Sequence, residues 1–350
     1  MAQRSIVILI NAVNVHASTL IKSDDDRVNS KCLTTATMSQ PNASLDCVHK
    51  FLFEWEARMA IDGVTIERSH YVVERVREFV VKTLVRHAAK RRADFGKFAV
   101  IPTDFVGMNV IANGFYERHE LTILRRLIES QGLSNTTALD IGANIGNHAV
   151  VFSKLFRDVI AFEPNPSVAA LLEANIVLSN CRNVKVQRVG LGPEDAVLPF
   201  TQDHEGNDGH GSFAIKGTST IDLQVKNGDN LLREIDPEIA NGRRRIGFVK
   251  CDVEGFEASV FMGLKQTLTD HSPIIVFESD QTGPGAEAYG VLQQYGYRHL
   301  YAIRETGDTI DGRFGRELKR LRSNYNFWLE PLDGIPAFWS NVIAAKHSLD

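Results

Sequence analysis

Acidic side chains follow four short apolar stretches of the sequence. They are Asp140, Glu163, Asp252 and Glu278. In an open parallel sheet the carboxyl ends of the strands meet at one edge, and ligands bind there. Four carboxylates around one crevice are costly to bury unless they meet donors or positive charge, which indicates a polar or cationic ligand. The alternative is that these acids end strands only because turns are polar.

A glycine-containing loop, residues 139–148, follows the first of these strands and opens a helix. Gly142 and Gly146 permit a tight turn and a close approach of the backbone to a ligand. Asn144 stands where the dinucleotide fingerprint has its middle glycine, which disfavours the pyrophosphate of NAD or FAD. Glu163 lies 21 residues after Gly142, a spacing at which a carboxylate accepts both ribose hydroxyls. S-adenosylmethionine is the commonest nucleoside cofactor without a diphosphate that satisfies both observations.

The elements that must position these residues follow the pattern of a parallel sheet with crossover helices. Short apolar runs alternate with helical stretches after Ile111. We expect strands at 137–139, 159–162, 184–189, 246–249 and 274–277. Further short strands are expected near 197–200 and 220–225, with a loop at 203–211 close to the site. These patterns predict an α/β fold.

Five motifs occur in a fixed order along the chain. They are Gly114-Phe-Tyr-Glu117, Asp140-Ile-Gly-Ala-Asn-Ile-Gly146, Phe162-Glu-Pro-Asn-Pro166, Lys250-Cys-Asp-Val-Glu-Gly-Phe-Glu257 and Phe277-Glu278. In this order they resemble the FkbM family of S-adenosylmethionine-dependent O-methyltransferases, over roughly residues 100–345. The resemblance implies a class I methyltransferase (Rossmann-like) fold, which has a mostly parallel seven-stranded sheet with an antiparallel last strand and helices on both faces. The final strands would come from 297–301, 325–329 and 339–344.

The resemblance also assigns roles to individual residues. The methionine end of the cofactor would be held by Asp140, Gly142, Asn144 and Gly146, and the ribose by Glu163. Asn175 matches another family position, where it either braces the crevice or only packs its helix. Glu117 either borders the acceptor pocket or is an acid favoured by a helix N-terminus.

The proton of the acceptor hydroxyl needs a base as the new bond forms, although alignment of the reacting atoms is the protein's main contribution. Asp252 and Glu254 are the leading candidates, because two close carboxylates push one pKa upward. His148, His204 and His210 are the rivals. Asp252, Glu254 and Glu278 as ligands of Mg²⁺ are an alternative. No cluster of recognised metal-ligand spacing accompanies them, so we expect no metal.

The expected function is methyl transfer to a hydroxyl of a sugar, of a glycan or glycolipid, or of a specialised metabolite. An NAD-dependent oxidoreductase on the same kind of sheet is disfavoured by Asn144 and by the lack of a Tyr-x-x-x-Lys pair near the site. A non-catalytic module that binds S-adenosylmethionine is the third alternative.

The charge and the cysteine content indicate which kinds of partner and which cellular compartment to expect. The chain has 39 Lys and Arg against 43 Asp and Glu, a net charge of -4, which disfavours a nucleic-acid partner. The four cysteines form no C-x-x-C pair, which argues against zinc ribbons and disulfide scaffolds and fits the cytoplasm. The apolar run at 6–10 is shorter than the h-region of a signal peptide. The Arg243–Arg245 run either steers an anionic substrate or is solvated loop charge.

Three regions are expected along the chain. Residues 1–50 are predicted to be poorly ordered, 51–105 to be a helical extension, and 106–350 to be the methyltransferase domain. Residues 71–92 carry apolar and basic side chains at helical spacing. This basic amphipathic helix is predicted to pack on its own domain, with weak contact to a membrane surface as the alternative. The sequence does not specify an oligomeric state.

Overall fold

The computed structural model describes residues 58–61, 64–67, 71–90, 97–202, 211–213, 220–279, 284–305, 326–334 and 340–349. The chain divides into two compact units, Met1–Val80 and Val81–Asp350. Residues 1–50, predicted to be poorly ordered, lie outside the described residues. The limits predicted for the three regions therefore stay predictions.

The first unit contains a strand pair inside the stretch predicted to be helical. β1 (Arg58–Ile61) and β2 (Val64–Glu67) pair antiparallel, with Ile61 opposite Val64. Val-Thr-Ile-Glu alternates apolar and polar residues, a strand pattern that the sequence analysis overlooked. α3 (Tyr71–Lys90) confirms the predicted helix, and its Val76, Phe79 and Leu84 side chains are exposed. None of the described helices is long and apolar enough to cross a membrane.

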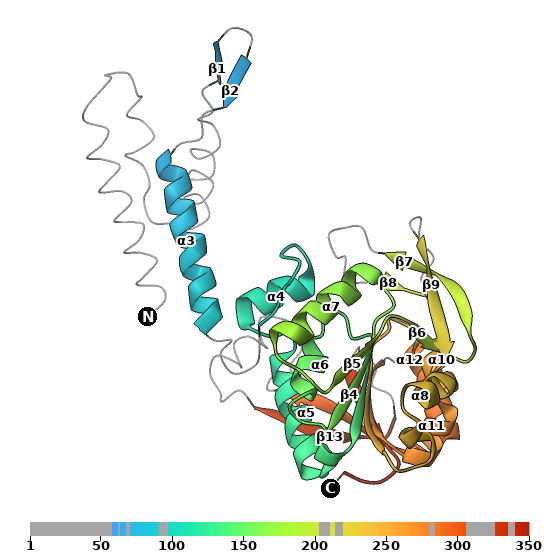
Figure 1. Ribbon diagram of the computed structural model, residues 1–350. Helices are drawn as coiled ribbons and strands as arrows, with labels where there is room; N and C mark the ends of the chain where they lie inside the picture. Colours follow the sequence, from blue (N-terminus) through green and yellow to red (C-terminus); the bar gives the residue numbers. More distant parts are fainter. Residues whose placement is uncertain are drawn as a thin grey trace. The chain divides into compact units, whose positions relative to one another are not determined.

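A large mixed sheet forms the centre of the second unit (Figure 1). Its strand order is β13-β12-β14-β11-β10-β3-β4-β5. The bounds are β3 (Thr137–Ile141), β4 (Asp158–Phe162), β5 (Val184–Gln187), β10 (Ile246–Cys251), β11 (Ile274–Ser279), β12 (His299–Glu305), β13 (Phe327–Leu332) and β14 (Ser340–Ala345).

Strand directions in this sheet confirm the class I methyltransferase fold. The five strands β11, β10, β3, β4 and β5 are parallel neighbours, and β14 runs antiparallel between β11 and β12. β13 pairs antiparallel with β12 at the edge. The described sheet therefore has eight strands, one more than the expected seven, because the run predicted at 325–329 adds an outer strand.

Helices cover both faces of the sheet. One face carries α5 (Arg118–Ser130), α6 (Asn147–Phe152) and α7 (Pro166–Leu178), and α4 (Phe105–Asn113) packs beside them (Figure 1). The other carries α8 (Gly228–Ile235), α9 (Pro237–Ala240), α10 (Glu257–Gly263), α11 (Lys265–His271) and α12 (Pro284–Gln294). Two separate apolar clusters result, and both include side chains of β3 and β10. This double burial explains why these strands are apolar throughout.

A small second sheet forms between β5 and β10 of the chain. It consists of β6 (Gly190–Gly192), β7 (Ala196–Gln202), β8 (Gly211–Ser212) and β9 (Thr220–Asn227), in the order β6-β9-β7-β8. The strands predicted near 197–200 and 220–225 are thereby confirmed. Most of the loop predicted at 203–211 lies outside the described residues.

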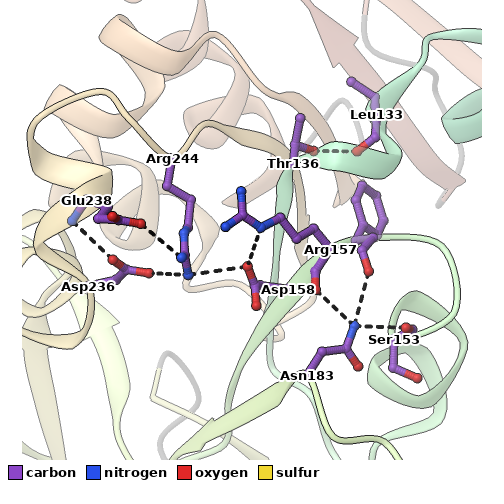
Figure 2. Close-up of polar contacts among 10 residues, drawn as sticks. Leu133, Thr136, Ser153, Arg157, Asp158, Asn183, Asp236, Glu238 and Arg244 are labelled. Carbon is purple, nitrogen blue, oxygen red and sulfur yellow. Dashed lines mark hydrogen bonds and ion pairs between the residues drawn. The ribbon is translucent and has the colours of Figure 1, made fainter.

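Arg244 anchors an ion-pair network before β10 (Figure 2). Its guanidinium lies 2.6 Å from the carboxylate of Asp236, 3.0 Å from Glu238 and 3.3 Å from Asp158. Asp158 begins β4, so the network lies at the amino ends of the strands, opposite to their carboxyl ends. Arg244 therefore ties the loop after α9 to β4, whereas Arg243 and Arg245 are exposed, as solvated loop charge would be.

Candidate active site

A cavity of about 350 Å³ lies at the carboxyl ends of β3, β4, β10 and β11, and we call it the carboxyl-end pocket. Parallel topology brings these strand ends together, as the sequence predicted. The predicted residues that line it are Gly142, Asn144, His148, Glu163, Asp252, Glu254 and Glu278. Glu117, for which a place at the acceptor pocket was one of two alternatives, also lines the cavity.

Gly142 holds the loop after β3 close to the end of β10. Its φ is +76°, and a Cβ atom there would lie 1.8 Å from the backbone oxygen of Asp252. The Asp252 N–H in turn donates to the Ile141 carbonyl at 3.0 Å. Only glycine allows this approach, and the bare backbone of Gly142 forms part of the pocket wall.

Gly146 serves the fold beside the pocket. It begins α6 with φ +89°, and a Cβ atom would lie 2.7 Å from Leu172 Cδ1 of α7. Gly146 is not among the pocket-lining residues. Its lack of a side chain lets α7 pack against the start of α6.

Backbone strain is concentrated around the carboxyl-end pocket. Glu117, Asn144 and Glu254 all have φ near +50°, a region that non-glycine residues rarely adopt, and all three line the cavity. Such conformations persist only where the surrounding structure enforces them, and they cluster at binding and active sites. The strain therefore supports a functional reading of this cavity.

Glu163 is a buried carboxylate that the backbone holds in place at the end of β4. Its two oxygens accept from the N–H groups of Asn144 at 3.0 Å and Asn165 at 2.9 Å. Burial raises its pKa to about 7, although both N–H groups lower it. Each oxygen has a second lone pair, so this carboxylate can accept further hydrogen bonds from a ligand in the pocket.

Asp140 and Asn175 lie outside the pocket lining. Asp140 is fully buried beneath it, where burial raises its pKa to about 6 against the charge of Lys250. The Asn175 amide accepts from Ala99 N at 2.6 Å and donates to the carbonyls of Ala99 and Ile145 at 3.0 and 2.8 Å. These contacts favour the bracing role for Asn175 over direct contact with a cofactor.

Lys250 is the residue that the sequence analysis missed. It is 4 % exposed, and its Nζ donates to Asp252 Oδ2 at 2.9 Å. Burial lowers the pKa of Lys250, but the carboxylates of Asp252, Asp140 and Glu117 outweigh it and hold the pKa above its usual value. Asp252 therefore has an ion pair with Lys250 in addition to its expected proximity to Glu254. The available signal was a lysine inside an otherwise apolar strand, two residues before an acid.

Glu278 completes an acidic side of the pocket. Oxygens of Asp252, Glu254 and Glu278 lie within 4.8 Å of one another. Burial raises the pKa of Glu278 to about 8, and the charges of Asp252 and Glu254 add to the rise. Glu278 is therefore a protonated carboxylic acid near neutral pH, able to donate a hydrogen bond.

His148 faces the pocket from the first turn of α6. It is 4 % exposed, and burial together with the charge of Lys250 holds its pKa well below 6.5. Its Nε2 lies 3.6 Å from Glu117 Oε2. The imidazole is therefore neutral at physiological pH. His204 and His210, the other candidate bases, lie outside the described residues.

The raised carboxyl pKa values predict an unusual pH dependence of stability. Burial raises the pKa of Glu163 to about 7 and that of Glu120 to about 8, against 4.5 in an exposed chain. Between pH 6.5 and 8.5 the folded protein therefore binds protons that the unfolded chain has lost. The free energy of unfolding should fall as pH rises, by on the order of 2 kcal/mol.

Urea denaturation of the ligand-free protein at several pH values measures this slope. Glu163→Gln, which removes one of these titrating groups, should flatten it. A stability that is constant or that rises between pH 6.5 and 8.5 would contradict the assignment of these buried acids.

Comparison with protein families gives a match over part of the chain. Residues 140–299 match the methyltransferase FkbM domain. No curated protein matches the chain in sequence.

Three solved structures are similar to this chain at low sequence identity. Precorrin-6y C5,15-methyltransferase from Geobacter metallireducens GS-15 is 14 % identical with a TM-score of 0.34, over 64 % of this chain and 87 % of that one. Precorrin 8w decarboxylase from Methanobacterium thermoautotrophicum is 14 % identical with a TM-score of 0.39, over 71 % and 98 %. Methyltransferase FkbM from Methylobacillus flagellatus KT is 15 % identical with a TM-score of 0.37, over 79 % of this chain and 61 % of that one.

Proposed function

Because residues 140–299 are a methyltransferase FkbM domain, we propose that the chain transfers a methyl group from S-adenosylmethionine to a hydroxyl group of a small polar acceptor. The observation that carries this proposal is a single cavity that joins the bare backbone of Gly142 to the fixed carboxylate of Glu163. The first permits close approach of a ligand, and the second accepts from a pair of ribose hydroxyls.

The residues around the cavity fit this cofactor. Glu163 would hold the ribose, while Gly142 and Asn144 would bring the backbone against the methionine part. The cavity of about 350 Å³ is within the usual range of small-molecule sites. When bound, S-adenosylmethionine supplies an activated methyl group on a sulfonium. The protein's own task is to align the acceptor oxygen with that group and to exclude water.

Asp252 is the proposed base for the acceptor hydroxyl. Its carboxylate lines the pocket at the end of β10, where the ammonium of Lys250 contacts one of its oxygens at 2.9 Å. This contact fixes the orientation of the side chain, and the other oxygen can accept the proton. Lys250 is a positioning residue in this scheme.

The acceptor proposed is a sugar hydroxyl, in a glycan, a glycolipid or a specialised metabolite. An aromatic cluster forms one wall of the pocket, with ring centres 5.0 Å apart for Phe200–Phe213 and 5.3 Å for Phe213–Phe256. Aromatic rings offer an apolar surface to the C–H face of a sugar, while carboxylates accept from its hydroxyls. The acids of the pocket disfavour phosphorylated acceptors and nucleic acid.

The cellular location and the contacts of α3 are proposals as well. Cys181 and Cys251 are buried free thiols, which fits the expected cytoplasmic location. Contact of α3 with a membrane surface remains the alternative to packing on the protein itself.

Glu163→Gln should weaken the binding of S-adenosylhomocysteine by about 1.5–3 kcal/mol, roughly 10- to 150-fold, the scale of a hydrogen bond to a charged group. Isothermal titration calorimetry measures this change. Glu173→Gln, which changes a partly exposed acid on α7 that pairs with Arg188, is the matched control and should bind as the wild type does.

Two results of the calorimetry would overturn the assignment. Unchanged affinity in a folded Glu163→Gln variant would remove Glu163 from the cofactor site. Binding of NAD in place of S-adenosylhomocysteine would favour the oxidoreductase instead.

A further inference from the structure

Three side chains from two helix starts converge beside the carboxyl-end pocket. Glu117 immediately precedes α5, Glu120 lies in its first turn, and His148 lies in the first turn of α6. One ligand atom from each of the three lies within 4.8 Å of the other two. Glu117 and His148 also line the pocket, so the cluster borders the cavity directly.

Each of the three residues turns a buried, unpartnered atom into this cluster. His148 Nε2, Glu117 Oε2 and Glu120 Oε1 are buried and have no hydrogen-bond partner among the described residues. His148 itself is 4 % exposed. An unpaired buried polar atom is costly, and three that converge on one point indicate a cation that would contact them all.

The spacing of the atoms fits metal ligands better than a hydrogen bond. The distance from His148 Nε2 to Glu117 Oε2 is 3.6 Å, longer than the 2.7–3.2 Å typical of N–H···O bonds. Two ligand atoms that lie about 2.0–2.2 Å from one ion at an angle near 110–120° are separated by roughly 3.4–3.6 Å.

The chemistry of the three donors selects a class of ion. His148 offers an imidazole nitrogen, which binds metals in its neutral form. One imidazole nitrogen with two carboxylate oxygens suits Zn²⁺ and related transition metals, whereas Mg²⁺ prefers oxygen ligands alone. A second residue also fixes the orientation of the Glu120 carboxylate. Asn341 Nδ2 donates to Glu120 Oε2 at 2.5 Å, which leaves Oε1 directed at the cluster.

Nearby charge does not oppose an ion here. Lys250 is the positive group that acts on both Glu117 and His148. Its charge is offset by the Asp252 contact and by Asp140, which pairs with Lys250 in register on the neighbouring strand. Glu117 and Glu120, ionised as metal ligands, would add further negative charge to the region.

We propose that Glu117, Glu120 and His148 bind one divalent transition-metal ion of the zinc class, with an open coordination position toward the carboxyl-end pocket. Three protein ligands and one open position are the arrangement of catalytic rather than structural zinc sites. The role of the ion rests on the proposed function: it would bind the acceptor hydroxyl and lower its pKa. The presence of the site does not depend on that function.

Metal content tests the site directly. The full chain is stripped with a chelator, dialysed against Zn²⁺ and analysed by inductively coupled plasma mass spectrometry. We expect one zinc per chain, and at least a 100-fold loss of affinity in both Glu120→Gln and His148→Asn. Glu129→Gln, an exposed acid on the same helix, should retain the ion. S-adenosylhomocysteine calorimetry on the same samples reports folding, and its failure in all of them would count against the proposed function, not against the metal site.

Cobalt substitution is a second test of the metal site. It uses the wild-type protein alone, so it remains valid even if a variant fails to fold. Co²⁺ should give the visible absorption of a four- or five-coordinate ion without a thiolate charge-transfer band. Absence of stoichiometric metal in the wild type would overturn the proposal. So would retention by both ligand variants, or loss in Glu254→Gln alone, which would place the ion among Asp252, Glu254 and Glu278.

Discussion

Replacing Asp252 with asparagine should lower the rate of methyl transfer about 10²- to 10⁴-fold, the usual effect of losing a positioned base. Asparagine keeps the size of the side chain but cannot take a proton from the acceptor. The affinity for S-adenosylhomocysteine should change little, because Glu163 and the Gly142 backbone supply the proposed cofactor contacts. Steady-state kinetics with an identified acceptor, together with calorimetry, measures both quantities.

Two further variants sharpen this result. Asp270→Asn, at an exposed position on α11, is the matched control and should leave the rate unchanged. Lys250→Met removes the group that contacts Asp252 and should also lower kcat, with a change in pH profile that a purely structural role would not produce. Near-full activity of Asp252→Asn with an unaltered pH profile would exclude Asp252 as the base.

Gly142→Ala should abolish detectable cofactor binding and lower the free energy of unfolding by about 3 kcal/mol or more. The new Cβ atom would stand 1.8 Å from the Asp252 backbone oxygen, so the loop after β3 and the end of β10 must separate. The positive φ of Gly142 adds roughly 1–2 kcal/mol of conformational strain for any residue with a Cβ. Urea denaturation and calorimetry measure the two effects.

Gly132→Ala separates strain from steric clash. Gly132 has a φ of +63°, but no atom lies within 4 Å of the Cβ position. This variant should therefore show only the strain, about 1–2 kcal/mol, with normal binding of S-adenosylhomocysteine. Equal effects of the two substitutions would mean that the contact between Gly142 and Asp252 does not matter to the site.

The features that could be predicted from the sequence are those that a short stretch of residues determines by itself. The apolar runs that end at Glu163, Asp252 and Glu278 are buried strands, and parallel topology then forces their ends to one edge. Gly142 was predictable for the same reason, since the turn after β3 is local. The outer strand β13 was placed by its apolar pattern, but its edge pairing with β12 depends on contacts that pattern does not encode.

The missed features depend on register and on distant segments. Asp140 is not among the pocket-lining residues and pairs in register with Lys250 on β10, while its predicted contact with the cofactor stays a prediction. Register between parallel strands is a three-dimensional property, so neither the burial of Asp140 nor the role of Lys250 could be read from spacing. Asn175 similarly binds Ala99, 76 residues away in the chain.

The most direct test of the central claim is transfer of a labelled methyl group. The full chain is incubated with S-adenosylmethionine labelled on the methyl carbon and with a panel of free sugars, glycosides and hydroxylated metabolites, alongside Asp252→Asn. We expect label in at least one sugar-containing product, as an ether that is stable to alkali, at a rate at least 100-fold lower in the variant. Transfer to nitrogen or carbon acceptors only, or equal transfer by both proteins, would contradict an O-methyltransferase that acts at the carboxyl-end pocket.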